Sequence, residues 1–382
     1  MATLRGEEVD RPPVSFYEID GYRQHPGDPD PYNIYSHPSW QPLLELARER
    51  SDRIVMWGVP FRGAPPDPLA ALTHREIEDT FGVDAETHEQ GGTRRTRISV
   101  NAGGRILSEQ QRRDRDVDTI WVVEHLLKDV ADLQAYLALP APEFGGTPDI
   151  EGFLRVEQEL GDSGIALIDT PDPLCQAAAL FDMATFTVIA FSEPHLFRQL
   201  LERFASVLLP QTEATARALP GRLWRIFGPE YASPPYLPPR LFRQYVVEYV
   251  KPMVASIQRY GGFGRVHCHG RLKAILDDIA ATGCVGLDPI EPPPQGDVDL
   301  SYVRQRYGQQ MVLFGNLEAS DLEFLPTPEF ARKIERALRE GTAGHGRGFV
   351  LMPSACPYGR ELPELALRNY ETMVEMAENW QR

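Results

Sequence analysis

Short runs of apolar residues alternate with longer amphipathic stretches through the second half of the chain. The apolar runs are 164–170 (GIALIDT), 264–270 (GRVHCHG), 284–291 (CVGLDPIE), 311–316 (MVLFGN) and 348–356 (GFVLMPSAC). Nearly continuous apolar runs of this length are typical of strands that are covered on both faces. The stretches between them carry apolar residues at helical spacing, so each joins two strands as a crossover helix. The alternation therefore predicts a sheet of parallel strands.

The first 160 residues add two strand candidates, at 13–19 (PVSFYEI) and 53–58 (RIVMWG), and then a polar, hairpin-like stretch over 93–125. The strand count comes to about eight, the number that closes a (β/α)₈ TIM barrel. We expect one barrel domain over residues 1–382, with the hairpin region inserted in its N-terminal part. An open, doubly wound sheet is the alternative.

Charge and composition narrow the class of partner. The formal net charge is −16, which argues against a nucleic acid or an anionic membrane as the binding partner. The N-terminus has no apolar core of a signal peptide, and no run reaches the roughly 18–20 apolar residues of a membrane span. Four cysteines are too few for a disulfide framework in a chain of this length. We expect a soluble, cytoplasmic protein.

One apolar run ends in a cluster of side chains that can bind a metal. Residues at i and i+2 of a strand point to the same face, so His267 and His269 share one face and Cys268 points to the other. Cys356 ends the last predicted strand, which opens on the same mouth of a closed barrel. Two imidazoles and one thiolate leave a fourth position free on a tetrahedral zinc, as in catalytic sites. The alternative for the pair is that one histidine is a hydrogen-bonded core residue.

Other polar residues follow predicted strands and are expected at the same mouth. Glu291 is a candidate catalytic residue and Asn316 a candidate substrate-binding residue, although each could instead cap a helix or order a loop. Glu18, Glu230 and Glu291 are candidates for the fourth zinc ligand.

Aromatic residues near the mouth are candidates for holding an aromatic substrate. They are Tyr22, Tyr358 and Phe314, although such residues more often belong to the core packing. We also expect Glu18 to act in catalysis and Glu230 to contact the substrate.

The order of these segments resembles the uroporphyrinogen decarboxylase superfamily over nearly the whole chain. The segments that carry the resemblance are 4–14 (LRGEEVDRPPV), 124–142 (EHLLKDVADLQAYLALPAP), 265–292 (RVHCHGRLKAILDDIAATGCVGLDPIEP), 311–338 and 348–377. Each motif alone is loose, but five of them in the same order are more specific. The resemblance implies a TIM barrel.

The superfamily contains two chemistries. Its decarboxylases need no metal and use an arginine-rich loop after the first strand, where this chain has Glu18 and Asp20 in the segment FYEIDGYRQHPGD. That difference argues against porphyrinogen decarboxylation. The second branch, cobalamin-linked methyltransferases, holds zinc through His-x-Cys and a distant cysteine. By position, its ligands correspond to His267 and Cys356, with His269 in place of the middle cysteine.

The resemblance thus implies a zinc-dependent methyltransferase. It would move a methyl group between a small methylated molecule, for example a methoxylated aromatic compound, and a corrinoid. The chain has no D-x-H-x-x-G corrinoid motif, so a separate partner protein would carry the corrinoid. The site would have one thiolate where relatives have two, which favours removal of the methyl group from the substrate. A metal-free lyase acting on a small carboxylic acid is the alternative enzyme, and a non-catalytic binding barrel is a third reading.

Overall fold

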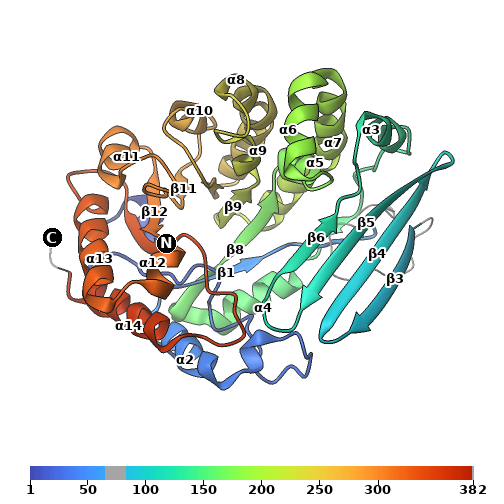
Figure 1. The fold of residues 1–382 in the computed structure, drawn as a ribbon. Coiled ribbons are helices and arrows are strands. Elements are labelled where there is room, and N and C mark those ends of the chain that lie inside the picture. The colour runs from blue at the N-terminus through green and yellow to red at the C-terminus, as the bar shows by residue number, and fades with distance from the viewer. Residues whose placement is uncertain (65–82, 381–382) are drawn as a thin grey trace.

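Parallel strands curl into a barrel at the centre of the protein (Figure 1). The structure, a computed structural model, describes residues 1–64 and 83–380. Seven strands pair in the order β1 (Arg53–Trp57), β8 (Gly164–Pro171), β9 (Leu223–Phe227), β10 (Phe263–His267), β11 (Gly286–Asp288), β12 (Val312–Leu317) and β13 (Phe349–Pro353). Val14 completes the ring, because it bridges Leu351 of β13 in parallel and accepts a hydrogen bond from the Asp52 amide at 2.7 Å. The predicted barrel is confirmed.

The strand predictions for the second half of the chain are confirmed, and two details differ. The expected strand at 13–19 is reduced to the bridge at Val14, since the chain turns at Tyr17, whose φ is 59°. Strand β9 was not predicted. Arg225 interrupts its short apolar run, so the run did not look like a buried strand.

Helices surround the barrel (Figure 1). They are α1 (Ala2–Arg5), α2 (Gln41–Arg50), α3 (Val130–Leu137), α4 (Glu151–Leu160), α5 (Pro173–Ala178), α6 (Met183–Ser192), α7 (Pro194–Ala218), α8 (Pro239–Phe242), α9 (Glu248–Arg259), α10 (Leu276–Ala281), α11 (Leu300–Tyr307), α12 (Ala319–Phe324), α13 (Thr327–Gly341) and α14 (Glu364–Glu378). Helix α13 buries Phe330, Ile334 and Leu338 at helical spacing. Across residues 1–64 and 83–380, no helix combines the length and apolar character that a membrane crossing requires.

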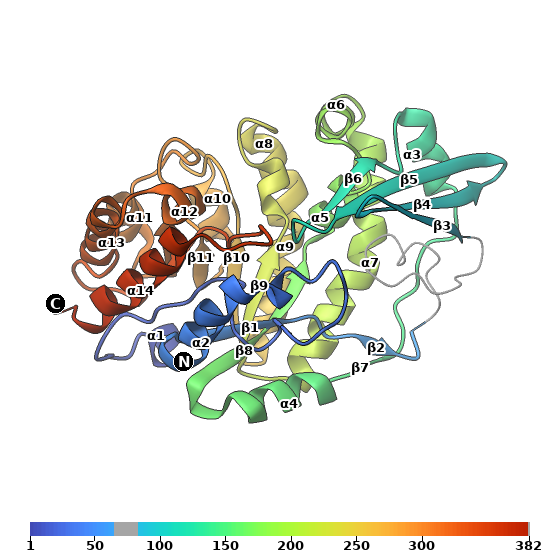
Figure 2. The same cartoon turned by 60° about the horizontal axis from the view of Figure 1, so that its bottom comes forward.

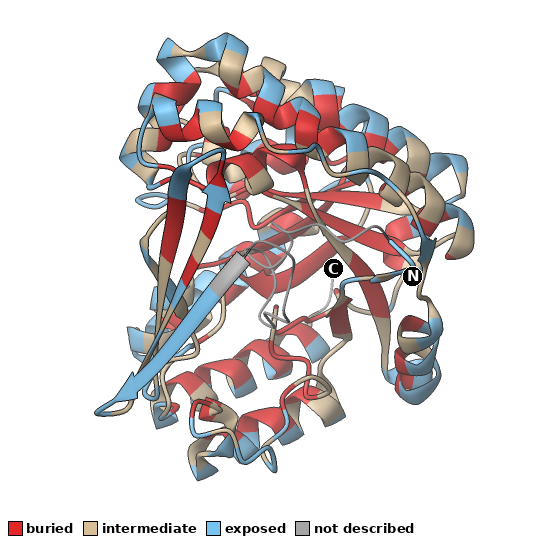
Figure 3. Cartoon of the chain, turned by 90° about the vertical axis from the view of Figure 1, so that its right-hand side faces the viewer, coloured by how far each residue is buried: buried red, intermediate tan, exposed pale blue. Residues whose placement is uncertain are grey.

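An antiparallel sheet is inserted between β1 and β8, as expected from the hairpin-like stretch. Its strands are β3 (Val83–Gln90), β4 (Thr93–Ala102), β5 (Arg105–Asp114) and β6 (Ile120–Glu124), and it extends to one side of the barrel (Figures 1 and 2). Val100, Ala102 and Leu107 join the main hydrophobic core. Residues 85–90 of the edge strand are exposed (Figure 3). A two-stranded ribbon, β2 (Phe61–Arg62) with β7 (Thr147–Pro148), lies on the connections to this sheet.

The inserted sheet is tied to the loop that follows β13. Val117, after β5, forms an antiparallel bridge with Gly359. The amide of Asp118 donates to the carbonyl of Tyr358 at 2.8 Å, and the amide of Arg360 donates to the carbonyl of Asp116 at 2.7 Å. The loop that contains Cys356 therefore continues into backbone pairing with the insertion.

Two hydrophobic clusters fill the barrel region. The outer cluster lies between the strands and the helices and includes Trp224, Val266, Leu287 and Leu313. The inner cluster fills the inside of the barrel and comprises Leu4, Tyr17, Ile54, Met56, Leu167, Leu223, Val312, Phe314, Val350 and Met352. Alternate residues of each strand belong to different clusters, as strand geometry requires.

Toward the carboxyl ends of the strands, the inward positions become charged. In β8 the inward residues run from Leu167 to Asp169, and in β9 from Leu223 to Arg225. Asp169 and Arg225 pair through two hydrogen bonds, Nε to Oδ1 at 2.7 Å and Nη2 to Oδ2 at 3.0 Å. In β10 the corresponding residue is Arg265, which is fully buried. Charge pairing therefore replaces apolar packing in the upper half of the barrel.

The second buried pair joins Arg265 to Asp288 of β11. The Arg265 Nε lies 2.9 Å from Asp288 Oδ1, and its guanidinium lies 4.6 Å from the centre of the Phe314 ring. Burial alone would raise the pKa of Asp288, but Arg265 and His267 lower it to about 2. Phe314, expected at the mouth, is thus an inner-core residue beneath this pair.

Replacing Arg265 by Met should test the importance of the buried pair. The variant leaves the Asp288 carboxylate buried without its main counter-charge, so we expect the free energy of unfolding to fall by about 3–5 kcal/mol in urea titrations. Arg306→Met is the matched control, because Arg306 pairs with Asp277 on the surface, and it should change stability far less. Equal losses in the two variants would contradict a special role for the interior pair.

Candidate active site

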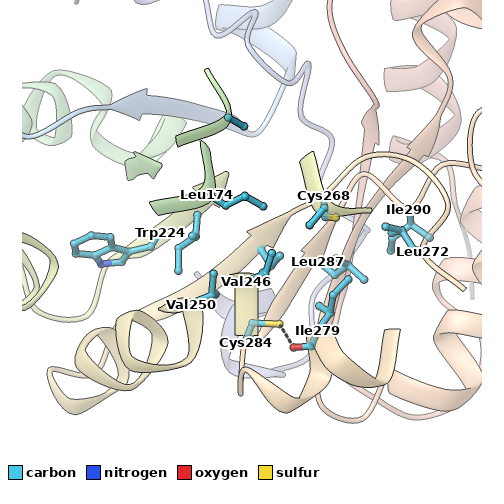
Figure 4. Packing of buried hydrophobic residues seen from close by; sticks show 14 of the residues in the cluster. Leu174, Trp224, Val246, Val250, Cys268, Leu272, Ile279, Cys284, Leu287 and Ile290 are labelled. Atoms are coloured by element: carbon cyan, nitrogen blue, oxygen red, sulfur yellow. Dashed lines mark hydrogen bonds between the residues drawn. The ribbon is translucent and has the colours of Figure 1, made fainter. Parts of the chain in front are cut away.

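Two histidines lie side by side at the carboxyl end of β10. His267 is the last residue of the strand, and His269 lies two residues further along the chain. Their ring centres are 4.6 Å apart at an interplanar angle of 83°. Cys268 points away from them and is fully buried among the outer-core residues Leu272, Leu287 and Ile290 (Figure 4). The prediction that the histidines share a face while Cys268 faces the helices is confirmed.

Each histidine is held by a carboxylate. Nδ1 of His267 lies 2.7 Å from Asp288 Oδ2, and Nδ1 of His269 lies 2.8 Å from Glu291 Oε1. The second Glu291 oxygen accepts the Gly270 amide at 2.8 Å, so both of its oxygens are engaged. A carboxylate on Nδ1 fixes the ring and leaves Nε2 for another partner, as is typical of metal-binding histidines.

The chain around Glu291 has an unusual backbone. Ile290, directly before it, has a φ of 56°, which is rare for a β-branched residue. Gly315 in β12 has a φ of 142°, and a Cβ there would lie 2.0 Å from the Pro289 carbonyl oxygen. Only glycine allows β12 to approach this closely. The strained segment brings Glu291 beneath His269, and strain of this kind is concentrated at functional sites.

A second chain of contacts reaches His267 from the N-terminal segment. The Tyr17 hydroxyl lies 3.5 Å from His267 Nε2 and accepts a hydrogen bond from Arg225 Nη1 at 2.7 Å. The two rings stack with centres 5.9 Å apart. Burial raises the pKa of Tyr17 above its usual range, so the hydroxyl keeps its proton.

Sequence reasoning missed Tyr17, Arg225, Asp169 and Asp288. For Arg225 and Asp288, the available signal was a charged residue within a short apolar run, at 223–227 (LWRIF) and 286–288 (GLD). For Tyr17 there was no such signal.

Cys356 lies in a different environment from the two histidines. Its thiol donates to Glu18 Oε2 at 3.7 Å, and Glu18 Oε1 lies 3.9 Å from Arg225 Nη1. Burial and the neighbouring Glu18 raise the pKa of Cys356 well above its usual value. In the part of the chain that the structure describes, no three His, Cys, Asp or Glu side chains are grouped closely enough to hold a metal ion. Two of the three expected ligands are therefore adjacent, and the third is not.

A cavity of about 360 Å³ opens beside His269. Its lining comprises Met183, Glu230, Tyr231, Ser233, Tyr236, His269, Gly270 and Glu291. Two residues that the sequence suggested for this mouth, Glu230 and Glu291, do line it.

The other expected substrate residues do not line this cavity. Asn316 lines a separate cavity of about 260 Å³ beside α13. The Tyr22 hydroxyl donates to Glu159 of α4 at 2.6 Å, and Tyr358 is exposed in the loop paired with the inserted sheet.

Glu318, directly after β12, is a further ionisable residue that sequence reasoning missed. Its side chain is 5% exposed, and Oε1 has no hydrogen-bond partner among the described residues. Burial, reinforced by the negative charge of Glu291, raises the pKa of Glu318 to about 7. It lines the same separate cavity as Asn316.

A solved structure of another protein shares this fold. A methyltransferase from Methanosarcina mazei is similar in structure over 99% of this chain and 96% of that chain, with a TM-score of 0.59 and 18% identity. The match to the structure of D-psicose 3-epimerase with D-tagatose from Clostridium cellulolyticum H10 covers 57% of this chain and 78% of that chain. The sequence identity is 11% and the TM-score is 0.33. Among curated protein sequences, none matches.

The family comparison is more direct. The family described as uroporphyrinogen decarboxylase (URO-D) matches residues 166–380, more than half of the chain. The match spans β8 to β13 apart from the first two residues of β8, so it includes both histidines, their carboxylates and Cys356. The chain belongs to the uroporphyrinogen decarboxylase family.

Proposed function

We propose that this protein is a zinc-dependent methyltransferase that moves a methyl group between a small methylated molecule and a corrinoid carried by a separate protein. The observation that supports the proposal most directly is the pair of adjacent histidines, each anchored through Nδ1 to its own carboxylate. Imidazole nitrogens positioned in this way suit zinc better than magnesium or calcium. The likeness in fold to a methyltransferase is consistent with this function.

His267 and His269 would hold the zinc ion, with Cys356 as the third ligand. The Cys356 thiol is hydrogen-bonded to Glu18 here, so its binding to the same ion requires a movement of the loop after β13. When bound, zinc would act as a Lewis acid on the substrate atom that carries the methyl group.

The chain's own residues have defined tasks in this proposal. Asp288 and Glu291 orient the two imidazoles and fix the proton on Nδ1. Tyr17, held by Arg225, borders the Nε2 side of His267. The cavity beside His269 would hold the methylated molecule.

A metal-free lyase acting on a carboxylic acid is less well supported. Such an enzyme needs a cation free to bind the substrate carboxylate. Inside the barrel, Arg225 is paired with Asp169 and Arg265 with Asp288, so neither offers an unpaired charge.

Metal analysis should find about one zinc ion per chain, because a soft thiolate with two imidazoles selects zinc. His267→Ala and His269→Ala should each lose the zinc and keep the native circular dichroism spectrum. Cys268→Ala is the matched control, since its thiol faces the outer core, and it should keep the metal. Full zinc content in a Cys356→Ala protein would remove that residue from the site.

Glu291→Gln should weaken zinc binding by roughly 10- to 100-fold, because the amide holds His269 less firmly than the carboxylate does. Competition with a chelating indicator at fixed pH measures the affinity. Glu159→Gln changes a carboxylate that accepts the hydroxyl of Tyr22 and should leave zinc affinity unchanged. An unaltered affinity in Glu291→Gln would argue against His269 as a ligand.

The purified protein should transfer a methyl group to or from a separately supplied corrinoid protein, measured by the change in visible absorption of the corrinoid. A site with two imidazoles and one thiolate keeps about one positive charge, so we expect demethylation of a donor to be faster than methylation of a thiol. A His269→Cys variant should shift this preference toward the thiol. Conversion of uroporphyrinogen to coproporphyrinogen would contradict the proposal.

A further inference from the structure

The cavity beside α13 is separate from the candidate active site. It has a volume of about 260 Å³ and shares no lining residue with the cavity beside His269. One part of its wall is apolar and is formed by Pro292, Pro293, Leu300, Leu317 and Ala337. An apolar wall with a few polar groups is typical of sites for small molecules, and this volume suits a ligand of a few heavy atoms.

The basic side chains of this cavity are already neutralised. Lys333 Nζ lies 2.5 Å from Asp321 Oδ2. Arg336 bridges two carboxylates, with Nη2 at 2.9 Å from Asp299 Oδ1 and Nε at 2.6 Å from Glu340 Oε1. All five residues line the cavity, so two cations face three carboxylates. The lining therefore carries an excess of negative charge before its fourth carboxylate is counted.

Glu318 is that fourth carboxylate, and it has no partner. Its side chain is buried, and among the described residues none forms a hydrogen bond or an ion pair with its carboxylate. Buried carboxylates are almost always paired or hydrogen-bonded in proteins. The side-chain amide of Asn316, in the same wall, likewise lacks a hydrogen-bond partner within the described part of the chain. Two acceptors are thus open to a donor from outside the chain.

The chemistry of the cavity narrows the class of that donor. A divalent metal ion requires several ligands around one point, and no three His, Cys, Asp or Glu side chains of residues 1–64 and 83–380 are grouped in this way. An anion would be repelled by the excess negative charge. A primary ammonium group brings one positive charge and three N–H donors, and its hydrogen bonds to a carboxylate are of the strong, charge-assisted kind.

We propose that this cavity binds a small aliphatic primary amine. Its ammonium group donates hydrogen bonds to Glu318 and Asn316, and its alkyl chain lies against the apolar wall formed by residues such as Leu317 and Ala337. The site does not depend on the function proposed above, because it shares no residue with the cavity beside His269.

Calorimetric titration of the full-length protein at about pH 8 with three probes of one chain length tests this inference. At that pH Glu318, whose pKa is about 7, is mostly ionised, and an alkylamine keeps its proton as lysine does. We expect butylammonium to bind at least roughly tenfold more tightly than 1-butanol, which lacks the charge. Butyltrimethylammonium keeps the charge but has no N–H group, and it should also bind at least roughly tenfold more weakly than butylammonium. Equal affinities for butylammonium and either analogue, or no binding of butylammonium, would overturn the inference.

A variant of the unpaired carboxylate provides the second part of the test. Glu318→Gln keeps the size of the side chain and removes a buried charge, so the variant should fold. It should lower the affinity for butylammonium by roughly tenfold and leave that for 1-butanol unchanged. Glu323→Gln is the matched control, because Glu323 lies on the same helix α12 but does not line the cavity. An unchanged affinity in Glu318→Gln, or an equal loss in both variants, would show that the amine does not bind at this carboxylate.

Discussion

The pairing of buried charges inside the barrel is the constraint on which the site depends. Arg225, Arg265 and Asp288 are buried inside the barrel, and Asp169, the partner of Arg225, is partly buried. Charges in such a place are tolerated only when each is matched by its partner, so the strands that contribute them must keep one register. Asp288 also binds His267, which means that the same pairing that holds β10 to β11 sets the orientation of a candidate metal ligand.

The lower half of the barrel provides the apolar core, and the upper half carries the candidate site. The lower half is filled by apolar residues, and it packs as an ordinary core. In the upper half, charged side chains replace that apolar packing. Two residues there, Tyr17 and Ile290, have a positive φ. Each of these residues directly precedes a carboxylate of the mouth, Glu18 or Glu291. Strain is therefore placed where side-chain direction matters most, and the lower core compensates for it.

The sequence allowed much of the fold and part of the site to be predicted. Strand–helix alternation and the His-x-His spacing depend on local periodicity, so the barrel, the shared face of His267 and His269 and the opposite direction of Cys268 could be predicted. Strand β9 was not predicted because Arg225 interrupts its apolar run. The partners of Arg225 are 56 and 208 residues away in the sequence. Tyr17 reaches the site through a backbone turn that its sequence does not signal. The position of Cys356 depends on a loop, whose path is fixed by long-range pairing.

That long-range pairing has a mechanical consequence. The segment 358–360 is joined to 116–118 by a bridge and two backbone hydrogen bonds. The loop with Cys356 is therefore linked directly to the inserted sheet. Tyr35 adds a further link, since its hydroxyl donates to Asp118 at 3.2 Å. This pairing begins two residues after Cys356, so the loop that carries the thiol is anchored to the sheet at its far end. In the proposed function, a displacement of the inserted sheet would therefore shift the loop that supplies the third ligand.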